Sequence, residues 1–123
     1  MEEGQAWRKI KYKEKFSNAF RGLRVFWATT KNLKIHALAA LLVIILGFVF
    51  SISALEHALI IFAIGLVFIT EALNTAIEID INLTSPEYHP YARDTKDVAA
   101  AAVLLASAIA VIVGLLVFLP KIF

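Results

Sequence analysis

The chain has 123 residues and no cysteine, 60% of its residues are hydrophobic, and its formal net charge is +2. Soluble domains usually contain about 45–50% apolar residues, so this composition excludes an ordinary soluble protein and predicts a small all-α membrane protein of one domain. The absence of cysteine also excludes disulfides, thiolate metal sites and cysteine nucleophiles.

The N-terminal region, residues 1–34, is basic and amphipathic. It contains nine of the 12 Lys and Arg residues, which by the positive-inside rule indicates the cytoplasmic side of a membrane. Apolar residues recur in it at helical spacing: Phe16, Ala19, Phe20, Leu23, Phe26 and Trp27. We therefore predict an amphipathic helix in the cytoplasmic interface, followed by a linker. In the alternative interpretation this helix only anchors the chain to anionic lipid.

Residues 35–123 are predicted to form a domain of three transmembrane helices. A spanning helix needs about 20 largely apolar residues, and the candidate spans are 35–55, 57–83 and 97–120. The middle span reaches this length only if it continues through "EALNTAIEIDINL". Three crossings would place "SISALEH" outside, and the loop 84–96, which turns at Pro86 and Pro90, inside.

The middle span carries an unusual polar stripe. At about 100° per residue, one face of a helix holds Glu71, Asn74, Thr75, Glu78 and Asn82, whereas Asp80 lies on the opposite face. A carboxylate in hydrocarbon costs about 2.5–3.5 kcal/mol on insertion scales. We therefore predict a site that binds a divalent cation and moves a proton. The alternative is that the stripe joins helices by hydrogen bonds, with its glutamates protonated or paired with Lys96 or Arg93.

The loop after this span adds candidate contacts to a phosphate. "SPEYHPYARDTKD" brings polar side chains to the membrane surface beside the stripe: Glu87, Tyr88, His89, Arg93, Lys96 and Asp97. A lysine on a polyphosphate and a glutamate that accepts a hydroxyl proton would suit phosphoryl transfer, although the chain lacks the familiar glycine-rich phosphate loops. Alternatively, Asp97 caps the third helix, and Tyr88 and His89 are merely interfacial.

The segments "EALNTAIE", "EYH" and "KD", in this order and ahead of "VAAAAVLLASAIA", resemble the prokaryotic diacylglycerol kinase family, which includes the undecaprenol kinases. The resemblance extends from about Arg21 to the end of the chain. It implies a homotrimer with an interfacial helix and three spans per protomer, and active sites shared between protomers at the cytoplasmic side. It also implies transfer of the ATP γ-phosphoryl group, with Mg²⁺, to a membrane lipid alcohol in the bacterial inner membrane, and no nucleic-acid partner.

The resemblance also implies roles for single residues. Glu71 would be the general base, with Asn74 as its polar neighbour, and Glu78 a metal ligand. The nucleotide contacts would be Glu87, Tyr88, His89, Lys96 and Asp97, together with Lys11 and Asn18 in the N-terminal helix.

This sequence departs from the family pattern at three positions. Asn18 stands where the family usually has an aromatic residue, Thr30 where it has a metal-binding glutamate, and Asn82 where it has an aspartate. Thr30 is therefore a doubtful metal position. Either the metal is held more weakly, or the chain is a catalytically silent scaffold or lipid-binding protein of the same fold.

The third span carries small residues every fourth position, at Ala102, Ala106, Ala110 and Gly114. Such a ridge lets helices approach closely, which favours self-association, although alanine is also simply tolerated in spans. An ion-conducting bundle is disfavoured because the outer halves of the spans are apolar. The lipid substrate stays open between diacylglycerol and undecaprenol, although "PEYHP" and "FLPKIF" are more similar to Gram-positive members.

Overall fold

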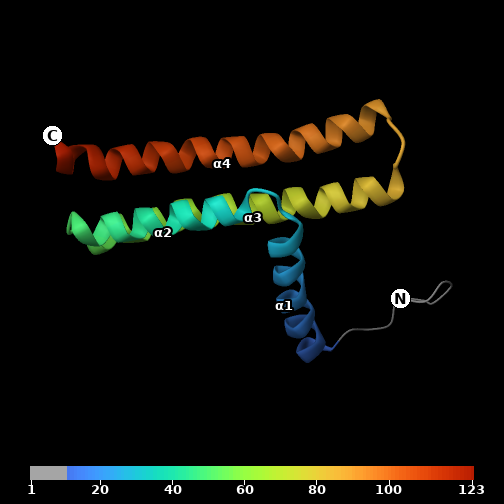
Figure 1. Cartoon of the computed structure of the whole chain (residues 1–123), viewed down its shortest axis with the longest axis horizontal. Coiled ribbons are helices and arrows are strands. Elements are labelled where there is room, and N and C mark those ends of the chain that lie inside the picture. The colour runs from blue at the N-terminus through green and yellow to red at the C-terminus, as the bar shows by residue number, and fades with distance from the viewer. Residues whose placement is uncertain (1–10) are drawn as a thin grey trace.

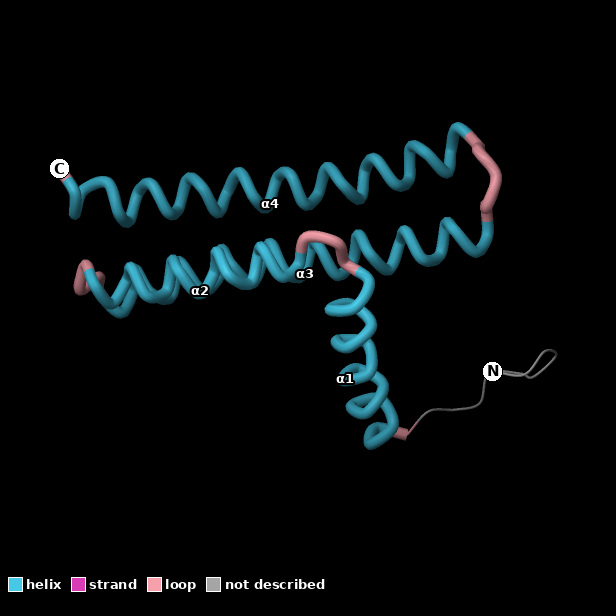
Figure 2. Tube along the Cα trace, viewed as in Figure 1, coloured by secondary structure: helices cyan, strands magenta, loops and turns pink. Residues whose placement is uncertain are grey.

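The computed structural model describes residues 11–123, which form four helices: α1 (Tyr12–Thr29), α2 (Leu33–Val49), α3 (Ala54–Thr84) and α4 (Pro90–Ile122). This part of the chain contains no strand, and short loops join the helices (Figure 2). The prediction of an all-α membrane protein is confirmed. Residues 1–10 of the predicted N-terminal region lie outside the described residues.

Helices α3 and α4 form a long antiparallel hairpin (Figure 1). Each is long and apolar enough to cross a membrane. The hairpin loop is shorter than the predicted loop 84–96, because α4 begins at Pro90. Proline is well suited to the first turn of a helix, where its missing N–H has no partner to lose. Helix α4 itself therefore contains Arg93, Lys96 and Asp97. Its N-cap is His89 and not Asp97, and the His89 ring accepts a hydrogen bond from the Tyr91 N–H.

Helix α2 lies beside the half of α3 that begins at Ala54 (Figure 1). It has 17 residues, about 25 Å at 1.5 Å per residue, and it ends at Val49. Residues 50–55 of the predicted first span therefore form the turn and the start of α3. Gly47, in the last turn of α2, allows this helix to approach the start of α3 closely, because an added Cβ would lie 2.9 Å from the His57 ring.

Helix α1 leaves the bundle at a right-angled corner formed by residues 30–32, with a bend of 102° between α1 and α2 (Figure 1). Its large apolar side chains are exposed, among them Phe16, Phe20, Leu23 and Trp27. A helix perpendicular to the spans with an exposed apolar stripe has the geometry expected for the predicted interfacial helix. The pair α1–α2 counts as a third candidate span only when the two helices are taken together.

The hairpin is fastened at the end that holds the α2–α3 turn and the C-terminus. Ile52, Ile60 and Val117 form a small buried cluster there. Ser53 and Glu56 form a capping box at the start of α3, and Lys121 Nζ lies 3.3 Å from Glu56 Oε1. Most other large apolar side chains are exposed, as expected for helices that face lipid or further protein.

The ridge of small residues on α4 has a role inside the chain. Ala106 is buried, and α4 packs mainly on α3. Ala110 and Gly114 line an apolar groove between α2, α3 and α4. At Ala106 the ridge therefore serves packing within the chain, and self-association through its other positions stays a prediction.

We expect the two ends of the hairpin to lie on opposite sides of the membrane. Leu55→Cys and Tyr91→Cys place single thiols at exposed positions near the two ends in a chain that has no cysteine of its own. An impermeant maleimide should label one in right-side-out vesicles and the other in inverted vesicles. Labelling of both from one side would contradict the predicted topology.

Candidate active site

The polar stripe of α3 faces the corner between α1 and α2. The Oγ1 atoms of Thr30 and Thr75 are 2.7 Å apart and share a hydrogen bond that joins the corner to α3. A cavity of about 310 Å³ opens beside this contact. It is lined by Thr29, Thr30, Lys31, Asn32, Glu71, Asn74, Thr75, Glu78, Ala100 and Val103. The structure thus brings both glutamates of the stripe into one cavity with the corner.

Asn74 stands between the two glutamates of this cavity. Its side-chain amide donates to Glu78 Oε1 at 3.3 Å. Its carbonyl oxygen Oδ1 is buried and has no hydrogen-bond partner within residues 11–123. Buried polar atoms are nearly always satisfied, so this oxygen is available to a ligand in the cavity.

Glu71 is the more enclosed of the two acids. Its side chain is 13% exposed, and its Oε1 lies 3.6 Å from Nε2 of His36 in the first turns of α2. Sequence reasoning missed His36, although an ionisable residue inside a predicted span is itself a signal of a functional site. The pairing with Glu71 could not be seen from helical spacing, because the two residues belong to different helices.

A second polar contact ties α3 to α4 near the hairpin loop. Lys96 Nζ donates to Asn82 Oδ1 at 2.6 Å, and Arg93 lies 3.7 Å from its neighbour Asp94. The alternative that Lys96 or Arg93 neutralises the glutamates of the stripe is therefore not what the structure shows. Because Asn82 is uncharged, the positive charge of Lys96 stays uncompensated by this partner.

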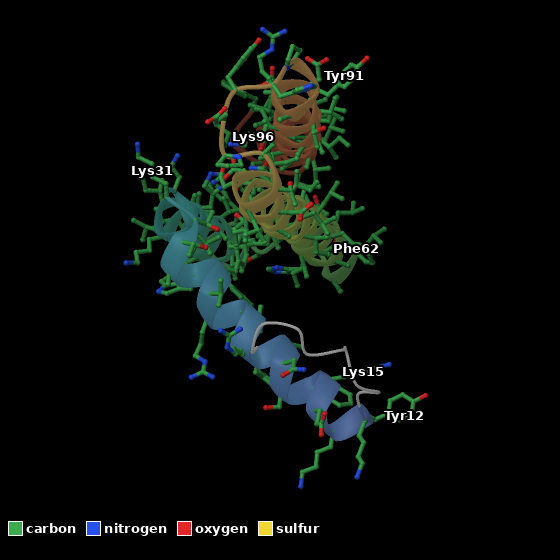
Figure 3. All side chains as sticks on the ribbon, turned by 90° about the vertical axis from the view of Figure 1, so that its right-hand side faces the viewer. Tyr12, Lys15, Lys31, Phe62, Tyr91 and Lys96 are labelled. Atoms are coloured by element: carbon green, nitrogen blue, oxygen red, sulfur yellow. The ribbon has the colours of Figure 1, made fainter. Side chains whose placement is uncertain are left out.

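The remaining predicted nucleotide contacts are spread over the structure. Glu87 and Tyr88 are exposed in the hairpin loop, His89 caps α4, and Asp97 is exposed on α4. Lys11 and Asn18 lie on or before α1, whose far end, marked by Tyr12 and Lys15 in Figure 3, extends away from the bundle. A single chain therefore does not bring Lys11 and Asn18 to the cavity, and the roles of all these residues stay predictions.

The cavity offers oxygen atoms that suit Mg²⁺. Within residues 11–123, no group of three His, Cys, Asp or Glu side chains is placed to hold a metal. Glu78, Asn74 and Thr30 line the cavity. The Oδ1 of Asn74 has no partner among residues 11–123, and the hydroxyl of Thr30 is bonded to Thr75. Mg²⁺ usually takes one or two protein carboxylates and completes its shell with phosphate and water. The residues present therefore fit such an ion.

Comparison with known proteins identifies the family. The family model for prokaryotic diacylglycerol kinase matches residues 17–118. This chain belongs to that family. It is accordingly a lipid kinase, and the resemblance found in "EALNTAIE", "EYH" and "KD" is confirmed.

Three relatives show the range of the family. An undecaprenol kinase of Bacillus subtilis (strain 168) is 43% identical over 106 residues, which cover 86% of each chain. A diacylglycerol kinase of Synechocystis is 40% identical over 85% of this chain and 61% of its own length. A diacylglycerol kinase of Escherichia coli (strain K12) is 34% identical over 76% of this chain and 77% of its own.

We expect Thr30→Glu to lower the Mg²⁺ concentration needed for half-maximal lipid phosphorylation. The new carboxylate would enter the cavity beside Glu78 and add an anionic oxygen near the metal. A tenfold shift corresponds to about 1.4 kcal/mol of added affinity. Thr30→Gln is the matched control, because it loses the same hydroxyl and has the size of glutamate without the charge, and half-maximal activity should need less Mg²⁺ in Thr30→Glu than in Thr30→Gln. An equal dependence in the wild type and both variants would show that residue 30 does not face the metal.

Proposed function

We propose that this protein transfers the γ-phosphoryl group of ATP to the hydroxyl of a membrane lipid alcohol, with undecaprenol as the preferred substrate. The observation that carries the proposal is the cavity at the α1–α2 corner, which combines an enclosed carboxylate, Glu71, with a second carboxylate, Glu78, and an orphaned amide oxygen. The preference for undecaprenol is supported by the Bacillus subtilis undecaprenol kinase, which aligns over most of both chains.

In the proposed reaction the oxygen of the lipid hydroxyl attacks the γ-phosphorus of ATP, and Glu71 accepts the proton of that hydroxyl. The bond between the γ-phosphorus and the bridging oxygen of ATP breaks, and ADP leaves. A positioned carboxylate of this kind typically contributes about 10²–10⁴-fold to the rate. Glu71 suits the role because its side chain is largely enclosed but still borders the cavity.

The neighbouring residues would hold the nucleotide and its metal. Glu78, Asn74 and Thr30 are the side chains that would bind Mg²⁺, and this ion would neutralise charge on the phosphate oxygens. Asn74 also orients Glu78 through its amide. Lys96, held by the neutral Asn82, would offer its full charge to the polyphosphate, and Glu87, Tyr88, His89 and Asp97 would surround the remainder of the nucleotide.

The depth of the site supports a lipid substrate. From Ala54 to Thr75, helix α3 is about 33 Å long at 1.5 Å per residue, close to the hydrocarbon thickness of about 30 Å. Thr75 is also the level at which the α1–α2 corner contacts α3. If α1 lies in the interface as proposed, Glu71 is just below the headgroups, where a lipid hydroxyl resides, and Glu78 and Asn82 reach the aqueous side that ATP occupies. The basic N-terminal region favours the cytoplasmic side of a bacterial inner membrane.

We further propose that the active unit is a homotrimer. In one chain the end of α1 marked by Tyr12 and Lys15 extends away from the bundle (Figure 3), so the nucleotide contacts expected of Lys11 and Asn18 require a second copy. The large exposed apolar surfaces of α3 and α4 leave room for such contacts between copies. Under this proposal a site is complete only when α1 of one copy meets α3 and α4 of another.

The apolar groove between α2, α3 and α4 suits the hydrocarbon chain of the lipid. Its volume is about 440 Å³, and its lining runs from His36 through Ala40, Val67 and Ser107 to Gly114. His36 also contacts Glu71, so the groove ends beside the proposed base. A chain held in the groove would present its terminal hydroxyl to Glu71.

The function is tested by offering the purified protein ATP, Mg²⁺ and either undecaprenol or diacylglycerol in mixed micelles. We expect phosphorylation of both, with the higher kcat/KM for undecaprenol, and a loss of at least about a hundredfold in Glu71→Gln, which keeps size but cannot accept the proton. If Glu71→Gln kept more than about a tenth of the activity, the base would lie elsewhere. No product from either lipid would favour the silent-scaffold alternative, and a preference for diacylglycerol would reverse the assigned substrate.

Filling the groove should affect the lipid and not the nucleotide. We expect Gly114→Leu to raise the KM for long-chain lipid alcohols while leaving the KM for ATP and the use of a short-chain alcohol unchanged. Gly65→Leu is the matched control, because both glycines have open space at the Cβ position but only Gly114 lines the groove. Equal effects of the two variants would show that the groove does not hold the lipid chain.

A further inference from the structure

His36 occupies a fixed position beside the proposed base. It lies in the first turns of α2, next to Leu33, which is only 2% exposed, and its backbone N–H donates to the carbonyl oxygen of Asn32 in the corner. Its ring nitrogen Nε2 is 3.6 Å from Glu71 Oε1, and the two side chains are 32% and 13% exposed. The corner that closes the cavity therefore also sets the position of this imidazole.

We propose that His36 is a positioning residue for Glu71, an inference that rests on the proposed function. Within residues 11–123 the Glu71 carboxylate has no other polar side-chain partner, because Asn74 gives its amide to Glu78. At 3.6 Å the pair lies just beyond hydrogen-bond distance, and a small closing of this gap lets Nε2–H, in the neutral tautomer or the imidazolium, donate to Oε1. Contact at Oε1 restricts rotation of the carboxylate and leaves Oε2 free to accept the proton of the lipid hydroxyl.

The location of the pair makes this restraint useful. His36 lines the apolar groove on one side, and Glu71 borders the polar cavity on the other. Without a partner, a nearly buried carboxylate would turn toward the cavity and the metal-binding oxygens of Glu78 and Asn74. With His36 in place, Glu71 stays at the junction of groove and cavity, where the lipid hydroxyl arrives. Misplacement of a reacting group by about 1 Å can cost about a hundredfold in rate.

Two variants at this position separate positioning from packing. His36→Gln keeps a donor of similar reach, whereas His36→Leu keeps apolar volume and removes the donor. We expect His36→Leu to lower kcat by about tenfold to a hundredfold with the KM for ATP unchanged, and His36→Gln to recover most of kcat. In the Glu71→Gln background, His36→Leu should cause no further loss, because residues that act as one unit are not additive.

The kinetic results can overturn the assignment in three ways. A kcat for His36→Gln as low as that for His36→Leu would show that a donor at this position is irrelevant. A raised KM for lipid with unchanged kcat would make His36 part of the groove only. A further loss of rate in the double variant would show that His36 acts independently of Glu71.

A spectroscopic measurement checks the contact without any turnover. The chain has three histidines, His36, His57 and His89, whose ring ¹⁵N resonances can be assigned by single substitutions in detergent micelles. Glu71→Gln should shift the resonances of His36 and leave those of His57 and His89 in place. No shift at His36 would overturn the proposal directly. If the His36 resonances shift but the protein phosphorylates neither lipid, the contact between His36 and Glu71 is real. The proposed function, and with it the catalytic role of the pair, would then be wrong.

Discussion

The level at which the corner of α1 and α2 meets the acidic stripe depends on one contact, the hydrogen bond between Thr30 and Thr75. It joins the corner of α1 and α2 to the middle of α3, and so determines where the basic helix leaves the bundle. The same contact places residues 29–32 opposite Glu71 and Glu78. The end of α1, the start of α2 and the acidic stripe of α3 thereby lie at the same depth, and the cavity forms where they meet.

The polar neighbours of the two glutamates reduce the cost of placing acids on a spanning helix. A carboxylate in hydrocarbon is costly, yet Glu71 has a histidine beside it and Glu78 accepts from Asn74. Beyond Thr75 the helix continues for further turns toward the hairpin loop, where Asn82 meets Lys96. The stripe thus passes from an enclosed setting to an open one along a single helix.

The stripe could be predicted from the sequence because it depends on helical spacing within one segment. Glu71, Asn74 and Glu78 had to share a face once the segment was helical. Contacts between segments could not be predicted in this way, which is why His36 was overlooked and Lys96 was considered as a partner for the glutamates. The start of α4 was misplaced for a different reason, since Pro90 was read as a breaker although proline also favours the first turn of a helix. The small residues of α4 have the spacing of an oligomer contact, but Ala106 serves packing within the chain.

The hairpin is clamped at both of its ends, by Lys121 with Glu56 at one and by Lys96 with Asn82 at the other. Sliding of α4 along α3 would break both contacts at once, so together they favour one register of the pair. Helix α2 packs on α3 far less extensively, and α1 is joined to α3 mainly near its last turn and the corner. The hairpin is therefore held together more extensively than the α1–α2 unit is held to it. We expect any movement during substrate entry or product release to occur in the α1–α2 unit, and such a movement would break the hydrogen bond between Thr30 and Thr75.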